Sequence, residues 1–323
     1  MSRGLAEQLT KYLTDAHSIE EQALAQLRTA PDLAGDPELA ASYREHLAET
    51  EEHERLVRGL LEARDAKPSR TKDAVMALGG KGFLLFARLN PDTPGKLHAH
   101  SLSYEALELA SYELLLRVAE RADEGEVADV AQRIADDERA MIERLESGYD
   151  RSVDASLREL EPDDLIEQLG KYLGDAHAIE EQAIQLLERA PRISEDGALA
   201  RVYSDHLGES RRHAELVEER LNALVDDSST LKDAALRLGA LNWGAFFQGH
   251  PDTPGKLAAF TYAFEHLEIG GYEQLKRVAR RAGDDGTITV ADRILGEERA
   301  AAGRIAGVFD EAVTASLAAQ GAG

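Results

Sequence analysis

Histidine and glutamate alternate along one face of a predicted helix over residues 37–66. His46, Glu49 and His53 are separated by three and then four residues, so their side chains form one stripe on that helix. Imidazole nitrogens and carboxylate oxygens are the donors with which helical bundles bind iron and manganese, although zinc accepts them too. The stripe therefore indicates a metal site on the inner face of this helix.

Three other helical segments each offer at least one carboxylate on a face that is otherwise apolar. Glu20 follows His17 by three residues, and Glu105 precedes Glu108 by three. Carboxylates that meet inside an apolar bundle are unfavourable as isolated charges, and a bound divalent cation supplies the compensating charge. The candidate ligands of this half are Glu20, Glu49, His53, Glu105, Glu108 and Glu138, and the further candidates, as ligands or as hydrogen-bond partners of ligands, are His17, His46 and Tyr112.

The same residues recur 160 positions later without a gap. The segment KYLTDAHSIEEQA at 11–23 returns as KYLGDAHAIEEQA at 171–183, and PDTPGKL is unchanged at 91–97 and 251–257. A period of this length is that of a whole domain, so we interpret it as a duplication and not as a solenoid. The second set of candidate ligands is Glu180, Glu209, His213, Glu265, Glu268 and Glu298, with His177, His206 and Tyr272 as the further candidates.

Each half contains four long segments of helical period, and the predicted domains are 1–155 and 156–323. The connection between the second and third helices is long and includes an apolar stretch, 72–86, that predicts one or two short helices. Two short links around one long crossover is the connectivity of ferritin-like bundles. We therefore expect an all-α protein, a tandem of two ferritin-like four-helix bundles. In the first half the predicted helices are 5–30, 37–66, 96–122 and 126–149.

The composition excludes several classes of function. The 323 residues include 61 acidic and 37 basic ones, and the formal charge of −24 argues against a nucleic-acid partner. The absence of cysteine excludes disulfides and thiolate metal sites. No apolar run approaches the roughly 20 residues that a membrane span needs, and no apolar signal segment follows the N-terminus. We therefore expect a cytoplasmic protein without a membrane partner.

Four short segments resemble the YciE/YciF-like branch of the ferritin-like superfamily. They read IEEQ at 19–22, HLAET at 46–50, EHLEIGGY at 265–272 and EERA at 297–300. The resemblance implies a four-helix bundle with a dinuclear iron or manganese site and an association with stress responses. It also implies that single bundles dimerise, so the two halves of this chain would form a pseudo-dimer, with further oligomerisation left open.

Two departures from the ferritin-like pattern affect the expected site. The fourth helix lacks the usual Glu-x-x-His pair, because Met141 stands three residues after Glu138 and Ala301 takes the equivalent position in the second half. The second helix has its histidines three before and four after Glu49. Either the site is asymmetric, with His17 in place of the missing imidazole, or it binds metal weakly or not at all.

Two functions from different classes are consistent with these patterns. The first is a dinuclear iron or manganese protein, which as an enzyme would be an oxidoreductase of the ferroxidase or peroxidase kind, acting on dioxygen or peroxide. The alternative is a non-catalytic helical stress or scaffold protein whose buried polar residues form a structural network. Storage of iron in a cage is disfavoured, because a fused double bundle would need a new assembly geometry.

Overall fold

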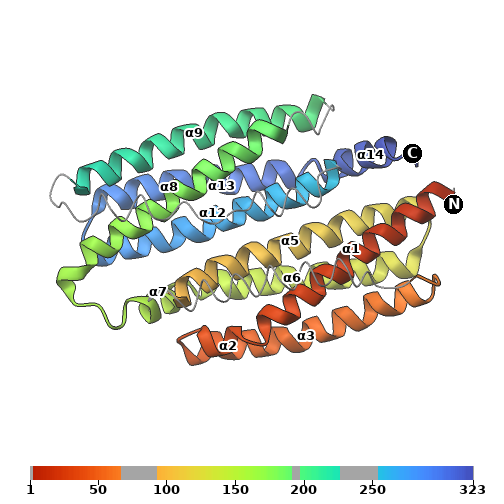
Figure 1. The fold of residues 1–323 in the computed structure, drawn as a ribbon, viewed down its shortest axis with the longest axis horizontal. Coiled ribbons are helices and arrows are strands. Elements are labelled where there is room, and N and C mark those ends of the chain that lie inside the picture. Colours follow the sequence, from red (N-terminus) through yellow and green to blue (C-terminus); the bar gives the residue numbers. More distant parts are fainter. Residues whose placement is uncertain (1–2, 67–92, 191–196, 226–253, 323) are drawn as a thin grey trace. The chain divides into compact units, whose positions relative to one another are not determined.

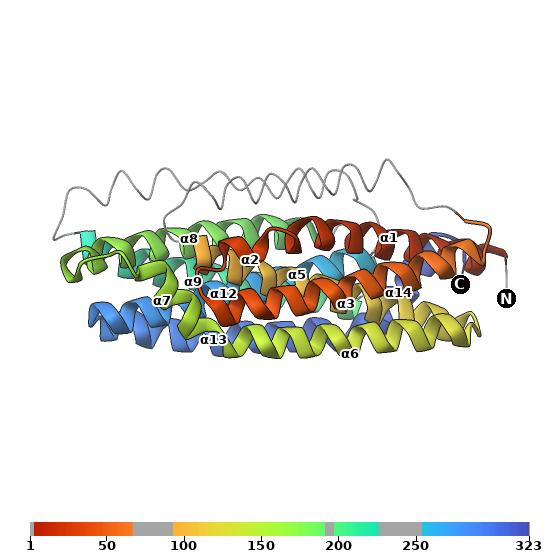
Figure 2. The same cartoon turned by 90° about the horizontal axis from the view of Figure 1, so that it is seen from below.

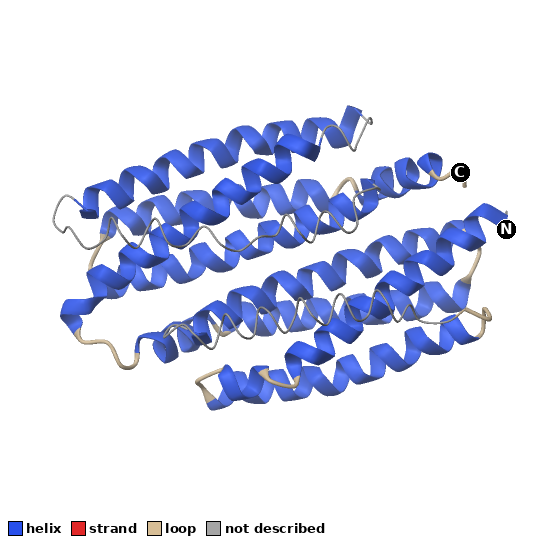
Figure 3. Cartoon of the chain, in the orientation of Figure 1, coloured by secondary structure: helices blue, strands red, loops and turns tan. Residues whose placement is uncertain are grey.

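The computed structural model describes residues 3–66, 93–190, 197–225 and 254–322. Every regular element within these ranges is a helix (Figure 1, Figure 3). This confirms the predicted all-α class. The short helices that the sequence predicts within 72–86 lie outside the described residues.

The first half folds into four long helices that run side by side (Figure 2). α1 packs against α3 and α5, and α6 packs against α5 and α3, which closes the bundle. Among the described residues of this half, two short helices accompany the four long ones. The elements are α1 (Arg3–Leu27), α2 (Ala30–Leu33), α3 (Pro37–Glu62), α5 (Thr93–Arg121), α6 (Gly125–Ser147) and α7 (Tyr149–Leu157).

The second half repeats this arrangement. α8 packs against α9 and α12, and α13 packs against α12 and α9. In both halves the connection between the second and third long helices is the long one, as predicted. The elements are η1 (Pro162–Asp164), α8 (Leu165–Arg189), α9 (Gly197–Val225), α12 (Pro254–Ala282), α13 (Asp285–Ala306) and α14 (Phe309–Ala319).

The start of α3 shows how the local sequence sets a helix boundary. The Asp36 carboxylate accepts hydrogen bonds from the backbone N–H groups of Glu38 (2.9 Å) and Leu39 (3.1 Å). Pro37 occupies the first helical position, where no N–H group is needed. Gly35, two residues earlier, has a φ of +67°, a conformation that residues with a side chain rarely adopt. The register of α3, and with it the stripe His46–His53, is therefore fixed from its N-terminus.

The chain divides into two compact units, and the division differs from the predicted one at the C-terminus. The first unit is Met1–Ser156 together with Ala312–Gly323, and the second is Leu157–Glu311. Within the first unit the Arg121 guanidinium donates a hydrogen bond to the Thr314 hydroxyl (2.9 Å). The sequence repeat could not predict this grouping, because it aligns α14 with α7 and contains no information on which helices the last segment contacts.

α5 and α12 are the most deeply buried helices of their units. Residues 97–110 of α5 are all buried, and the equivalent stretch of α12 is nearly so. Their small and apolar side chains let the neighbouring helices approach on several sides. Any charged side chain in the middle of α5 or α12 therefore lies in the core. Within the described residues, no helix has the length and apolar character that crossing a membrane requires.

Candidate metal centre

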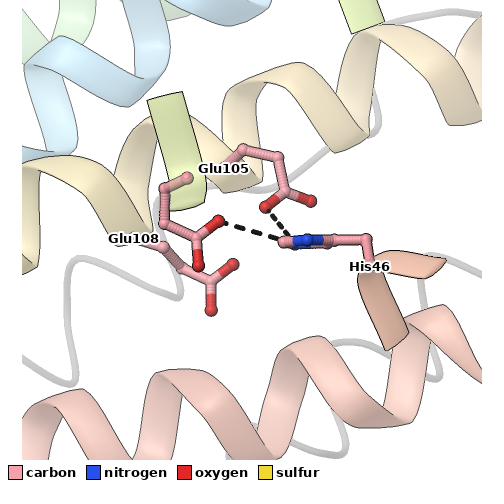
Figure 4. A group of neighbouring side chains, drawn as sticks. His46, Glu105 and Glu108 are labelled. Carbon is pink, nitrogen blue, oxygen red and sulfur yellow. Dashed lines mark hydrogen bonds and ion pairs between the residues drawn. The ribbon is translucent and has the colours of Figure 1, made fainter. Parts of the chain in front are cut away.

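Six acidic and imidazole side chains from four helices converge inside the first bundle. All six residues are at most 3% exposed. Figure 4 shows the His46 imidazole of α3 pointing toward the carboxylates of Glu105 and Glu108 on α5. The converging residues are Glu20, His46, His53, Glu105, Glu108 and Glu138.

His46 lies at the centre of the first of two groups. Its Nε2 atom is 2.8 Å from Glu105 Oε2 and 3.5 Å from Glu138 Oε2. One donor atom each from His46, Glu105, Glu108 and Glu138 lies within 4.8 Å of the others. Four donors at this spacing can surround one cation.

His53 belongs to a second group, about two helical turns along α3 from His46. Its Nδ1 atom is 3.1 Å from Glu138 Oε1 and 4.0 Å from Glu20 Oε1. The Glu20 carboxylate in turn accepts a hydrogen bond from the Tyr112 hydroxyl. Glu138 is common to both groups, so the two groups meet at one carboxylate.

Each of the two imidazoles has a second carboxylate behind it. Glu49 Oε2 is 2.9 Å from His46 Nδ1, and Asp137 Oδ2 is 3.1 Å from His53 Nε2. The side chains of Glu49 and Asp137 are 32% and 41% exposed, so both reach toward solvent. Glu49 is also 2.6 Å from Arg144 Nη2.

Glu49, which the sequence predicts as a ligand, lies apart from the converging residues. Glu49 and its counterpart Glu209 lie behind His46 and His206, outside both groups. His46, predicted only as a further candidate, takes the inner position. Asp137 was not predicted as a candidate. The signal that could have identified it is the acidic residue that both halves have at this position.

His17, the candidate for the missing imidazole, does not join the six residues. Its Nε2 atom is 3.1 Å from Glu54 Oε1, and it forms a separate group with Glu21 and Glu54. Its counterpart His177 is half-buried and belongs to none of the groups in the second bundle.

The second bundle reproduces the two groups. His206 Nε2 is 2.8 Å from Glu265 Oε2, and His213 Nδ1 is 2.7 Å from Glu298 Oε1. The Tyr272 hydroxyl donates a hydrogen bond of 2.5 Å to the Glu180 carboxylate. The converging residues are Glu180, His206, His213, Glu265, Glu268 and Glu298, with Glu298 common to both groups.

The electrostatics of the first centre reflect crowding of acidic groups without enough positive charge. Burial, reinforced by neighbouring carboxylates, raises the pKa of Glu108 and Glu138 well above the ordinary value and that of Glu20 to about 8. Burial lowers the pKa of His46, but the Glu105 and Glu138 carboxylates outweigh it and hold that pKa well above the ordinary value. The site as folded therefore retains protons that a cation would replace.

The comparison with protein families agrees with the repeat. A family model described as a domain of unknown function, DUF892, matches residues 4–158 and again residues 164–318. The chain belongs to this family. The two consecutive matches confirm that it contains two copies of one domain. No solved structure matches the chain.

Both DUF892 domains carry a buried carboxylate that the described residues leave without a hydrogen-bond donor. Both side-chain oxygens of Glu108 are in this state, and so are both oxygens of Glu268. A buried polar atom without a partner is costly, and a cation of suitable charge satisfies it. An oxygen-rich donor set with two imidazoles suits iron or manganese, so the residues fit a dinuclear centre of these metals.

Proposed function

We propose that each half of the chain binds two iron or manganese ions and reacts with dioxygen or peroxide. The observation that carries the proposal is the set of six buried donors, arranged in two groups with one common carboxylate and present in both halves. In the first half, Glu20, His53 and Glu138 would hold one ion. His46, Glu105, Glu108 and Glu138 would hold the other.

The charge of the site supports two divalent cations and not one. Four carboxylates, on Glu20, Glu105, Glu108 and Glu138, bring four negative charges when ionised, and two divalent cations balance them. The two imidazoles then bind as neutral ligands. When bound, a pair of redox-active metals supplies electrons to an oxygen species.

The residues around the donors orient them and connect them to solvent. Glu49 holds the outer nitrogen of His46 and Asp137 holds that of His53, which leaves one nitrogen of each ring directed at the centre. The Tyr112 hydroxyl fixes one oxygen of Glu20. Because Glu49 and Asp137 are partly exposed, each imidazole links the buried site to a carboxylate that can exchange protons with water.

The segments that resemble the YciE/YciF-like branch include residues of the centre, such as His46 and the Glu265–Tyr272 element. On this basis we extend the proposal to a role in a stress response. The alternative, a non-catalytic stress or scaffold protein, would use the His46–Glu105 pair as part of a structural network.

Elemental analysis of untagged protein from iron- and manganese-supplemented cells tests the proposal. The two centres together are expected to hold about four such ions per chain. The ions should be lost in a folded Glu108→Ala, Glu268→Ala double variant and retained in the control Glu51→Ala, which changes an exposed carboxylate. Iron-loaded wild type should then consume dioxygen or peroxide in an electrode assay. Metal-free wild type that also fails to bind added iron(II) without oxygen would leave the scaffold function as the better description.

A further inference from the structure

A second cluster of metal-binding residue types lies in the first bundle, apart from the six donors. His17 and Glu21 come from α1 and Glu54 from α3, and one donor atom of each lies within 4.8 Å of the others. His17 Nε2 and Glu54 Oε1 are 3.1 Å apart. His17 and Glu54 are 4% and 6% exposed, whereas Glu21 is half-buried. Two side chains of the cluster are therefore buried, and the third reaches toward solvent.

The helical spacing explains why these residues meet. His17 and Glu21 are four apart and lie on one face of α1. Glu54 follows His53 directly, and one residue turns an α-helix by roughly 100°. His53 accordingly faces the dinuclear centre, while Glu54 faces α1 and reaches His17. One helix pair thus supplies donors to two separate places.

The second half provides a natural comparison, because it keeps two of the three residues. His177 and Glu181 correspond to His17 and Glu21, but Ala214 stands in place of Glu54. There His177 is only half-buried and Glu181 is exposed. The imidazole is therefore buried in the half that has the carboxylate from the second long helix, and only half-buried in the half that lacks it.

The charges around Glu54 leave one of its oxygens directed at the cluster. Arg58 Nη2 lies 3.1 Å from Glu54 Oε2, on the side where the arginine side chain is 45% exposed. The other oxygen, Oε1, faces His17. One imidazole and two carboxylates form a donor set that divalent transition metals accept, with water completing the coordination.

We propose that the first half binds one additional divalent transition-metal cation at His17, Glu21 and Glu54, and that the second half does not. Glu21, the residue after Glu20, is half-buried, so this site lies on the partly open side of α1. A chain with full occupancy would thus hold an odd number of ions, divided unequally between its halves.

Cobalt(II) binding measured by equilibrium dialysis and visible absorption tests this site separately from the dinuclear centres. The measurement uses a Glu108→Ala, Glu268→Ala background, which weakens both centres equally. Adding His17→Ala should remove one cobalt ion per chain, or weaken its binding at least tenfold. Adding the matched His177→Ala should remove none.

Glu54→Ala and Glu54→Gln in the same background should repeat the effect of His17→Ala. The first variant is tolerated by the fold, since Ala214 occupies the equivalent position, and the second keeps the size of the side chain. Equal cobalt binding by the His17→Ala and His177→Ala proteins would overturn the proposal and leave His17 and Glu54 as an ion pair. The dinuclear centres are judged independently, from the ions lost between wild type and the background variant.

Discussion

At the residue scale, the outer nitrogen of each imidazole in the two centres contacts a partly exposed carboxylate. The inner nitrogen of His46 faces Glu105 and its outer nitrogen faces Glu49, and the same chain of contacts recurs at His206. The hydrogen bond with His46, reinforced by Arg144, lowers the pKa of the Glu49 carboxyl to about 2 and keeps it ionised. A fixed negative charge behind the ring raises the basicity of the nitrogen that faces the site.

We therefore expect Glu49→Gln with Glu209→Gln to weaken metal binding without removing a ligand. Loss of an outer carboxylate of this kind reduces metal affinity by about 10- to 100-fold. Competition with a chelator of known affinity, using manganese(II), measures the change. Glu51→Gln is the control, because Glu51 is exposed and follows Glu49 by only two positions. An unchanged affinity in the double variant would show that Glu49 does not position His46.

The buried carboxylates should lower the stability of the metal-free protein relative to a variant with apolar side chains in their place. Glu108 and Glu268 have no hydrogen-bond donor among the described residues, and an unsatisfied buried polar group costs about 1–3 kcal/mol. Glu108→Leu with Glu268→Leu is expected to stabilise the metal-free chain by a similar amount and to abolish the gain in stability on adding metal. Urea unfolding at pH 8, with and without manganese(II), measures both effects. Lower stability of the metal-free variant would mean that the carboxylates serve the fold itself.

The residues of the centre were largely predictable from sequence, but their directions were not. His46 and His53 are seven residues apart, which is nearly two helical turns, so both point the same way. Glu49 is rotated by roughly 60° from His46 on the same helix, enough to place it outside the groups. Spacing identified the stripe, whereas the packing of α3 against its neighbours decided which of its members face inward. His17 shows the same limitation, since α1 directs it to Glu54.

At the scale of elements, the end of α6 is fitted closely to α5 and α3. The His98 side chain of α5 donates a hydrogen bond of 2.7 Å to the Leu145 carbonyl in the last turn of α6. A Cβ atom on Gly148 would lie 2.8 Å from His98 Cε1 and 2.8 Å from Leu39 Cδ2. Gly148 thus permits three helices to meet. In the second half, Ala258 replaces His98 and the constraint is absent.

Gly148→Ala should therefore destabilise the first bundle, by about 1–3 kcal/mol as expected for overpacking. In the second half the position equivalent to Gly148 is already occupied by Val308, so the comparison is made at the neighbouring Gly307. Gly307→Ala should alter stability by less than about 1 kcal/mol, because a Cβ there meets only carbonyl oxygens at 3.3 and 3.4 Å. Chemical denaturation of both metal-free variants, followed by circular dichroism, compares them. Equal losses would indicate that the contact with His98 is not what requires a glycine.

The elements themselves were predictable because periodicity and turn residues agree along most of the chain. The stripe-bearing helix begins at the Asp36 cap and Pro37, as local signals indicate. The third helix begins at Thr93, three residues earlier than the apolar pattern suggests, since the PDTPGKL turn also supplies its first helical residues. The grouping of Ala312–Gly323 with the first unit depends on tertiary contacts, which no local signal encodes.

At the scale of the whole molecule, two buried acidic centres determine how stability depends on pH. Burial raises the pKa of Glu20 and of Glu265 to about 8, from 4.5, and carboxylates around His213 raise its pKa to about 10 despite burial. The folded chain holds these protons where the unfolded chain has released them. The stabilising contribution of such groups is complete below the unfolded pKa and is lost as pH rises through the folded pKa.

The metal-free protein should consequently lose stability between pH 6 and pH 9, whereas the metal-loaded protein should not, because cations replace the retained protons. Glu49 acts in the opposite direction, but its contribution changes only as pH falls from 4.5 toward 2, outside this window. We expect the melting temperature of the metal-free chain to fall by at least about 5 °C across the window, the equivalent of one or two kcal/mol for a bundle of this size. Calorimetry at four pH values, with and without manganese(II), measures the two curves.

The Glu108→Leu, Glu268→Leu variant should show a shallower decline of the melting temperature with pH, since removing one carboxylate from each centre relieves the repulsion that raises the remaining pKa values. A metal-free melting temperature that stays level or rises would mean that the centres are already neutralised within the fold, and the case for two cations in each half would fail with it.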